Sequence, residues 1–326
     1  MASLLLSCTP MESTPTRSQN TRQGTALIAT GDSMVVSVVP LSSAPFEVSL
    51  PLLGKAQSSF ILALAARVSR SDPKTLVIAA RTNDGALGVG TLDLQSQRLS
   101  TFRWLSVSPT WASNLAIDDL GQRICFVDHN GTTGNVYGPL TELDITTGLK
   151  RVLLPVCEDT AIFWRQDKIL VTAISSSMDS FKPLKSLPTI PAEPSESWPG
   201  WPYVCQVNPD TNKVIALFAG VLLATEYDGD SMVSTGGYYS VTGNLIRSHS
   251  LIGQNEAARL AIAFRSPVLA SWQNGTLLSV EKDVVSETET NSKGTYRLQL
   301  VDPNGSKRIL LTIKGLWLPP VCCYAF

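Results

Sequence analysis

The feature that most limits how this chain can fold is a strand–turn–strand unit that occurs five times. Each copy is a short apolar, β-branched run ending near Asp, Asn or Thr, then a turn rich in Gly, Asn, Thr or Ser, then a second run. The copies lie at 91–102, 141–154, 205–218, 238–251 and 298–313. Helical periodicity is scarce, so the sequence predicts an all-β protein built from repeated hairpins.

A second repeat is the string GDSMV, which occurs at 31–35 and returns at 229–233 after a similar Leu-Ala-Thr stretch. If one repeat unit spans about 50 residues, as kelch-like units do, the two copies lie about four units apart. The other interpretation is coincidence in a chain rich in Ser and Gly. Taken as a repeat, the string places both copies on one ring of similar units.

Such repeats predict a single β-propeller over residues 25–326, with six blades of four antiparallel strands. Packing successive sheets around an axis buries both faces of each sheet and leaves only short edges. The expected blades lie near 25–53, 60–105, 112–155, 159–219, 222–253 and 257–316. The first and fifth are short, so five or seven blades are also compatible, and the last residues are expected to close the ring against the first blade.

Charge and hydropathy exclude several partners. The 326 residues contain 26 Lys and Arg against 27 Asp and Glu, which argues against recruitment to nucleic acid or to an anionic membrane. No window reaches the ~18 consecutive apolar residues of a membrane span, so we expect a soluble protein. Residues 1–24 are expected to be a flexible lead-in, and the oligomeric state is not indicated.

The six cysteines are not spaced like the ligands of a zinc site, because the sequence has no CxxC pair and no Cys/His cluster. Cys125 lies in an apolar run and is expected in the core. An isolated bridge between Cys322 and Cys205, or between Cys323 and Cys157, stays open. The redox compartment therefore stays open as well, with the cytoplasm favoured over secretion.

One proline-rich stretch, residues 175–203, interrupts the pattern of strands. Its six prolines exclude regular strand, so we expect an insertion within the fourth blade. The two tryptophans, Trp198 and Trp201, favour a lid or binding loop over a ligand. The alternative is a loop without a function.

The stretch SNLAIDDLGQRICFVDHN (113–130), followed by LTELDITTGLKRVLL, resembles one blade of a group of six-bladed propellers. The group includes the YWTD repeats of lipoprotein receptors, the NHL repeats and the gluconolactonase/strictosidine-synthase-like enzymes. In these blades an apolar-Ala-apolar-Asp strand, a turn, an aromatic strand ending in Asp and an Asp-x-x-Thr-Gly hairpin follow one another. The resemblance supports the fold more than any activity.

In the lactonase-like members an Asn just before the inner strand is a metal ligand at the mouth of the axial channel, and Asn114 resembles that residue. The sequence departs from the pattern, because Leu115 replaces the usual Gly and no counterpart of the first-strand Glu is found. Ca²⁺ at Asn114 is thus an alternative to a strand cap, and we expect a metal-independent protein without a cofactor.

No catalytic motif is specific, so candidates come from geometry. Loops that lead into the innermost strands of a propeller converge on the axis, and residues there share one pocket. Asp159 and Glu256 are the candidate acid and base. His129 follows Asp128 at the end of an apolar strand, where its side chain could reach the loop face. The candidate ligand-binding residues are Gln57, Trp111, Asn114, Asp128, His129, Trp198, Trp201 and Arg259.

Two functions follow from these patterns. In the first, the stand-alone propeller binds a small organic molecule in its axial pocket, and could be a cofactor-independent hydrolase, cyclase or isomerase of specialised metabolism. In the second, it is a non-enzymatic scaffold whose loops bind other proteins.

Overall fold

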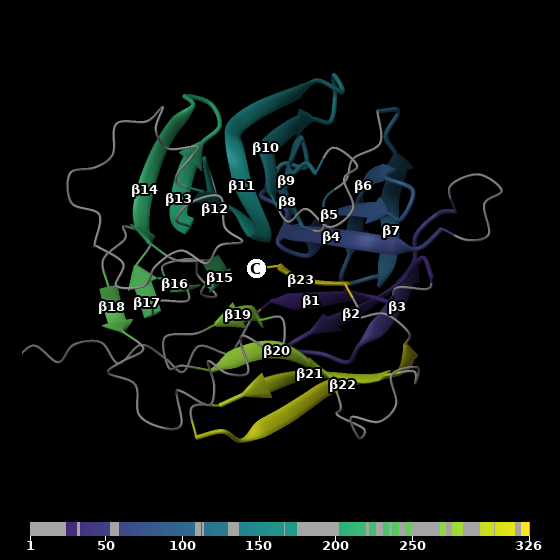
Figure 1. Ribbon diagram of the computed structural model, residues 1–326. Helices are drawn as coiled ribbons and strands as arrows, with labels where there is room; N and C mark the ends of the chain where they lie inside the picture. Colours follow the sequence, from purple (N-terminus) through teal and green to yellow (C-terminus); the bar gives the residue numbers. More distant parts are fainter. Residues whose placement is uncertain are drawn as a thin grey trace, which may run out of the picture.

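The computed structural model describes most of the ring and contains only β-strands as regular elements within the described residues. Those residues are 24–30, 33–52, 59–107, 112, 114–129, 137–165, 167–174, 202–219, 222–225, 231–234, 237–240, 245–248, 268–271, 276–282, 294–302, 304–316 and 321–325. Figure 1 shows the sheets arranged around a common centre, near which the C-terminus lies.

Four of the five sheets have four antiparallel strands each. The first contains, in spatial order, β23 (Val321–Ala325), β1 (Thr25–Ala29), β2 (Val35–Pro40) and β3 (Phe46–Ser49). The second contains β4 (Ile61–Val68), β5 (Thr75–Thr82), β6 (Leu87–Asp93) and β7 (Arg98–Trp104). The other two are β15 (Leu222–Thr225), β16 (Ser231–Ser234), β17 (Gly237–Ser240), β18 (Leu245–Ser248), and β19 (Val268–Ser271), β20 (Leu277–Lys282), β21 (Gly294–Val301), β22 (Lys307–Leu316).

The fifth sheet has seven strands because two blades share one long strand. Its strands are β8 (Leu115–Ile117), β9 (Arg123–Val127), β10 (Tyr137–Asp144), β11 (Lys150–Arg165), β12 (Lys168–Ile174), β13 (Pro202–Asn208) and β14 (Lys213–Ala219). The first half of β11 pairs with β10 and the second half with β12. Counting β11 in both blades, the described strands form six sets of four.

The chain closes its own ring through its last strand. β23 pairs antiparallel with β1, from Thr25 opposite Ala325 to Ala29 opposite Val321. The first blade therefore takes one strand from the C-terminus and three from the N-terminus, which confirms the expected closure. The pairing covers the inner edge of β1 and makes β23 the innermost strand of the first blade, with its own free edge toward the axis.

All five predicted hairpins are present: β6–β7, β10–β11, β13–β14, β17–β18 and β21–β22 are antiparallel pairs. Three of their turns have the same hydrogen bonds. The side chain of Asp93, Asp144 or Asn208 accepts from the backbone N–H groups two and three residues later. This side-chain acceptor replaces water on the backbone of the turn, which is why Asp or Asn recurs there.

The GDSMV strings do not occupy equivalent positions. The first connects β1 to β2, which are the second and third strands of their sheet counted from the centre. The second connects β15 to β16, the first and second strands. The two copies thus lie four blades apart on one ring, as expected, but at different positions within their blades, because the C-terminal strand fills the innermost position of the first blade.

The apolar cores lie between neighbouring sheets, and the inner strands β4, β8, β11 and β23 each contribute to two of them. In β4, Leu64 and Ala66 face the first blade, whereas Ala63 and Ala65 face the third. Successive side chains of a strand point to opposite faces, so a strand buried on both faces is apolar throughout. This explains the continuous apolar runs that the sequence analysis assigned to strands.

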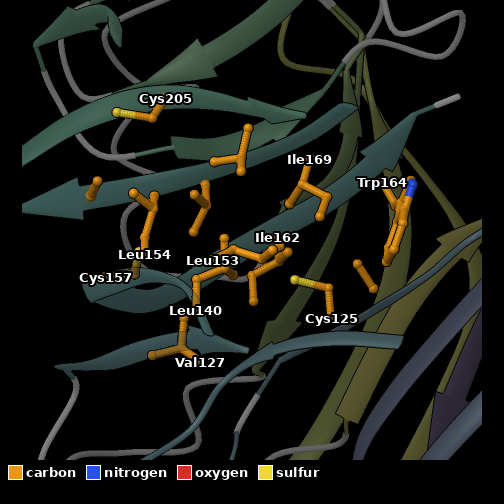
Figure 2. Packing of buried hydrophobic residues seen from close by; sticks show 14 of the residues in the cluster. Cys125, Val127, Leu140, Leu153, Leu154, Cys157, Ile162, Trp164, Ile169 and Cys205 are labelled. Atoms are coloured by element: carbon orange, nitrogen blue, oxygen red, sulfur yellow. The ribbon is translucent and has the colours of Figure 1, made fainter. Parts of the chain in front are cut away.

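The core between the third and fourth blades holds three of the cysteines (Figure 2). Cys125, Cys157 and Cys205 are fully buried and form no disulfide, and the position of Cys125 in the core is as expected. Cys322 and Cys323 lie in β23 and form no disulfide either. The two disulfide bridges left open by the sequence are not formed.

The proline-rich stretch starts after the end of β12 at Ile174, and residues 175–201 lie outside the described part of the chain. Its last two residues, Pro202 and Tyr203, belong to β13, so the prediction that the whole stretch excludes strand is wrong at this end. Pro202 is the first residue of the strand, a position that tolerates its missing N–H.

Candidate functional site

A cavity of about 290 Å³ lies on the axis of the ring. Every inner strand contributes to its wall: β4, β8, the second half of β11, β15, β19 and β23. The described lining is predominantly apolar and includes Leu64, Ala161, Phe163, Leu222 and Leu269. A concave, mostly apolar space with few polar groups is the usual form of a small-molecule site.

Residues that lead into neighbouring inner strands meet at one end of this cavity. Asn114 directly precedes β8 and lines the cavity, and it contacts Asp159, which lies in β11 just before the cavity wall begins. Arg81, near the end of β5, donates from Nη1 to the carbonyl oxygen of Ala112 at 2.8 Å. Together with His129, these residues (Arg81, Asn114, Asp159) define what we call the mouth.

The carboxylate of Asp159 binds two other residues of the mouth, Asn114 and His129. Its Oδ1 accepts hydrogen bonds from the backbone N–H and the side-chain Nδ2 of Asn114, at 3.1 and 3.0 Å. Its Oδ2 accepts from Nε2 of His129 at 2.6 Å. Because both carboxylate oxygens are engaged and the side chain is only 1 % exposed, Asp159 ties the third blade to the fourth.

Charged and titratable side chains at the mouth influence one another's pKa values. The hydrogen bond to Asp159 raises the pKa of His129, and it outweighs burial, which alone would lower that pKa. Burial lowers the pKa of Arg81, and the negative charges of Asp159 and Asp128 oppose that change. Asp128 itself lies 3.7 Å from the ammonium group of Lys150.

Glu158 is a mouth-side carboxyl that the sequence analysis missed. Its Oε2 is buried and accepts no hydrogen bond, and burial raises the pKa of its carboxyl. It pairs across the sheet with Tyr137 on one side and Thr172 on the other. Asp159, by contrast, accepts hydrogen bonds from three donors, so the two adjacent carboxyls have different surroundings.

A third connection between blades extends the pattern. Thr172 in β12 accepts a hydrogen bond from the backbone N–H of Leu222, the first residue of β15, at 3.0 Å. Arg81, His129 and Thr172 thus reach from three successive blades to the start of the next inner strand. Sequence reasoning found His129 but missed the other two, because neither follows a turn or motif that marks it.

Four of the ten predicted site residues lie in the described part of the chain, and they come together. Asn114, Asp159 and His129 form the network above, and Asp128 is next to His129 and influences its pKa. The other six lie outside the described residues: Gln57, Trp111, Trp198, Trp201, Glu256 and Arg259.

At the mouth, the Asn that the resemblance implied as a metal ligand is hydrogen-bonded to Asp159. The amide nitrogen of Asn114 donates to Asp159, and both Asp159 oxygens accept hydrogen bonds from protein groups. Within the described ranges, no group of three or more His, Cys, Asp or Glu side chains could hold a metal ion. Asn114 instead anchors the start of β8.

Comparison with known proteins gives no match in sequence and a clear one in fold. No protein-family profile and no curated protein matches the chain. TolB from Acinetobacter baumannii is similar in structure, with a TM-score of 0.50 and 11% identity over 94% of this chain and 67% of that one. The chain is a β-propeller. The predicted fold class is confirmed, and the resemblance to six-bladed propellers holds at the level of the propeller fold.

Two other propeller structures are similar over nearly the same length. A putative TolB from Agrobacterium tumefaciens matches 93% of this propeller and 98% of its own chain, at 13% identity and a TM-score of 0.45. The Dos1 propeller matches 91% of this chain and 73% of its own, at 14% identity and a TM-score of 0.41. These identities speak for the fold alone. Among the described residues no helix is long and apolar enough to span a membrane.

Proposed function

We propose that this propeller binds a small, largely apolar organic molecule in its axial cavity. The observation that supports the proposal is the cavity itself: about 290 Å³, walled by apolar side chains of all six inner strands. Transfer of apolar surface from water into such a space favours binding, at about 25 cal/mol per Å². The polar mouth then sets which molecules enter.

Hydrogen bonds between two blades also hold the mouth residues in place. This favours a ligand-binding site over an axis that is filled by the protein's own side chains. Asn114, His129 and Asp159 connect two blades through short hydrogen bonds that involve a nearly fully buried carboxylate. A site held by such contacts loses little conformational freedom when a ligand binds. We therefore place the opening for the ligand beside Asn114, which belongs to both the network and the cavity wall.

The test uses N-phenyl-1-naphthylamine, an uncharged aromatic dye that fluoresces when it leaves water. Ala161 lines the cavity and is only partly buried, so Phe at this position should occupy part of the cavity. The matched control adds the same ring on the same strand at Val152, which is 58% exposed. Fluorescence titrations on the wild type, Ala161→Phe and Val152→Phe, each with a thermal melt, compare their affinities.

The proposal predicts saturable binding by the wild type and by Val152→Phe. Ala161→Phe should bind at least about tenfold more weakly, because a tenfold change corresponds to the loss of only about 1.4 kcal/mol of contact. Absence of saturable binding, or equal binding by Ala161→Phe, would contradict the proposal and favour the protein-interaction scaffold.

A further inference from the structure

The end of the cavity opposite the mouth has a different chemistry. The start of β4 is at the mouth, because Ile61 pairs with Thr82, next to Arg81. Arg67, near the other end of β4, pairs with Val77, and the turn after β8 approaches the same valine. Gly121 in that turn has φ +68°, and a Cβ there would lie 2.7 Å from Val77, so this close approach depends on glycine.

Two more inner strands end at this side. The backbone N–H of Ile61 donates to the carbonyl oxygen of Ser33, which places the end of β1, and with it the start of β23, at the mouth. Arg123, the first residue of β9, lies over the ring of Trp164 at 5.0 Å, which places the end of β11 at the opposite side. The far end, as we call it, consists of the last or next-to-last residues of four inner strands: Arg67, Ile117, Trp164 and Tyr324.

Arg67 is the only charged side chain among the described residues that line the cavity. A guanidinium group keeps its charge at all ordinary pH values. Its attraction for an anion is stronger beside apolar walls than in water, because the surrounding dielectric is lower. Its planar donors match the oxygens of a carboxylate or sulfonate, and Trp164 and Tyr324 offer aromatic surface beside it.

We infer that the ligand of the axial cavity is an apolar organic anion, such as an aromatic carboxylate or sulfonate, whose acidic group meets Arg67 at the far end. This inference rests on the proposed function, since it requires a molecule in the cavity. It adds the chemical class of that molecule and the direction in which it lies, with its apolar body toward the mouth.

Two dyes that share one ring system separate this inference from the proposed function. N-phenyl-1-naphthylamine is neutral, and 8-anilino-1-naphthalenesulfonate carries the same rings with one sulfonate. The measured quantity is the ratio of their affinities for each protein variant. Comparing ratios removes the difference in hydrophobicity between the dyes, and each variant's thermal melt establishes that it is folded.

The inference predicts that Arg67→Gln lowers the preference for the sulfonate, measured as the ratio of the two affinities, about tenfold, the size expected for one charged hydrogen bond. Arg98→Gln is the matched control, since Arg98 is exposed on an outer strand and its replacement removes the same charge. Arg67→Lys should retain part of the preference. If Arg67→Gln changes the ratio no more than Arg98→Gln, the inference is wrong while the proposed function stands.

Salt provides a test on the unaltered protein. Added sodium chloride should weaken binding of the sulfonate dye and leave binding of the neutral dye nearly unchanged, because ions screen charge pairs. Equal salt responses of the two dyes would overturn the inference. Failure of the wild type to bind the neutral dye would overturn the proposed function and the inference together.

Discussion

Two adjacent acidic residues of β11 show how the position of one residue on a strand decides its role. Asp159 accepts three hydrogen bonds and connects two blades, whereas an oxygen of Glu158 is buried without a donor. Successive strand residues point to opposite faces, so the two carboxyls meet different neighbours. A buried oxygen without a partner costs stability, and proteins commonly keep such groups where function needs them.

Replacing Glu158 by Gln should therefore stabilise the propeller at neutral pH. Burial raises the pKa of this carboxyl above its ordinary value of 4.5, so the folded protein holds the proton more tightly than the unfolded chain. The free energy of unfolding must then fall as pH rises from 4.5 through the raised pKa, and it stays lower above that pKa. Gln cannot ionise, so Glu158→Gln should lack this loss.

Urea unfolding between about pH 4 and pH 8 measures this effect. The stability gain of Glu158→Gln over the wild type should be smallest at the acidic end and grow with pH. Glu47→Gln is the control, because Glu47 is exposed in β3. A gain that is the same at every pH would argue against a buried, ionising carboxyl.

Among the elements, the hairpin turns require one residue with a positive φ, which few residue types adopt at low energetic cost. Gln97, Gly148 and Asn212 each follow a turn with the same Asp or Asn acceptor, and all three have positive φ, of 59°, 74° and 55°. A left-handed conformation suits Gly and is tolerated by Asn, but it is costly for Gln.

Gln97→Gly should thus stabilise the protein by about 0.5–1 kcal/mol, after the greater freedom of Gly in the unfolded chain is subtracted. Ser96→Gly, one residue earlier in the same turn and without positive φ, should instead destabilise it. Chemical denaturation of both variants gives the comparison. A destabilised Gln97→Gly would show that its side chain matters more than its backbone conformation.

The elements also explain what the sequence could predict. The hairpins were predictable because local sequence signals mark them, in three of the five the Asp or Asn acceptor before the turn. Asn114 and Asp159 were predictable because loops into inner strands must converge, and His129 because it ends an apolar strand at the loop face. Arg67 and Glu158 were not, since continuous apolar strands do not reveal which face is buried, and Arg81 reaches a carbonyl 31 residues away. The strand positions of the GDSMV strings within their blades were not predictable, because they depend on a closure made at the other end of the chain.

At the scale of the whole molecule, the ring makes the cavity. Closure of β23 on β1 brings the C-terminal strand into the wall, so residues near both ends of the chain line one space with the middle of the sequence. Four of the inner strands, β4, β8, β11 and β23, give side chains to two cores each, and every described inner strand has an edge toward the axis. The cavity is thereby framed by packed sheets, with a polar mouth at one end and Arg67 at the other.

A crystal structure of the propeller with bound N-phenyl-1-naphthylamine would locate the ligand itself. We expect electron density for the dye on the axis, between Leu64, Ala161 and Leu222 and below Asn114. Density for the dye only on the outer surface, or an axial cavity filled by the protein's own side chains, would contradict the proposed function.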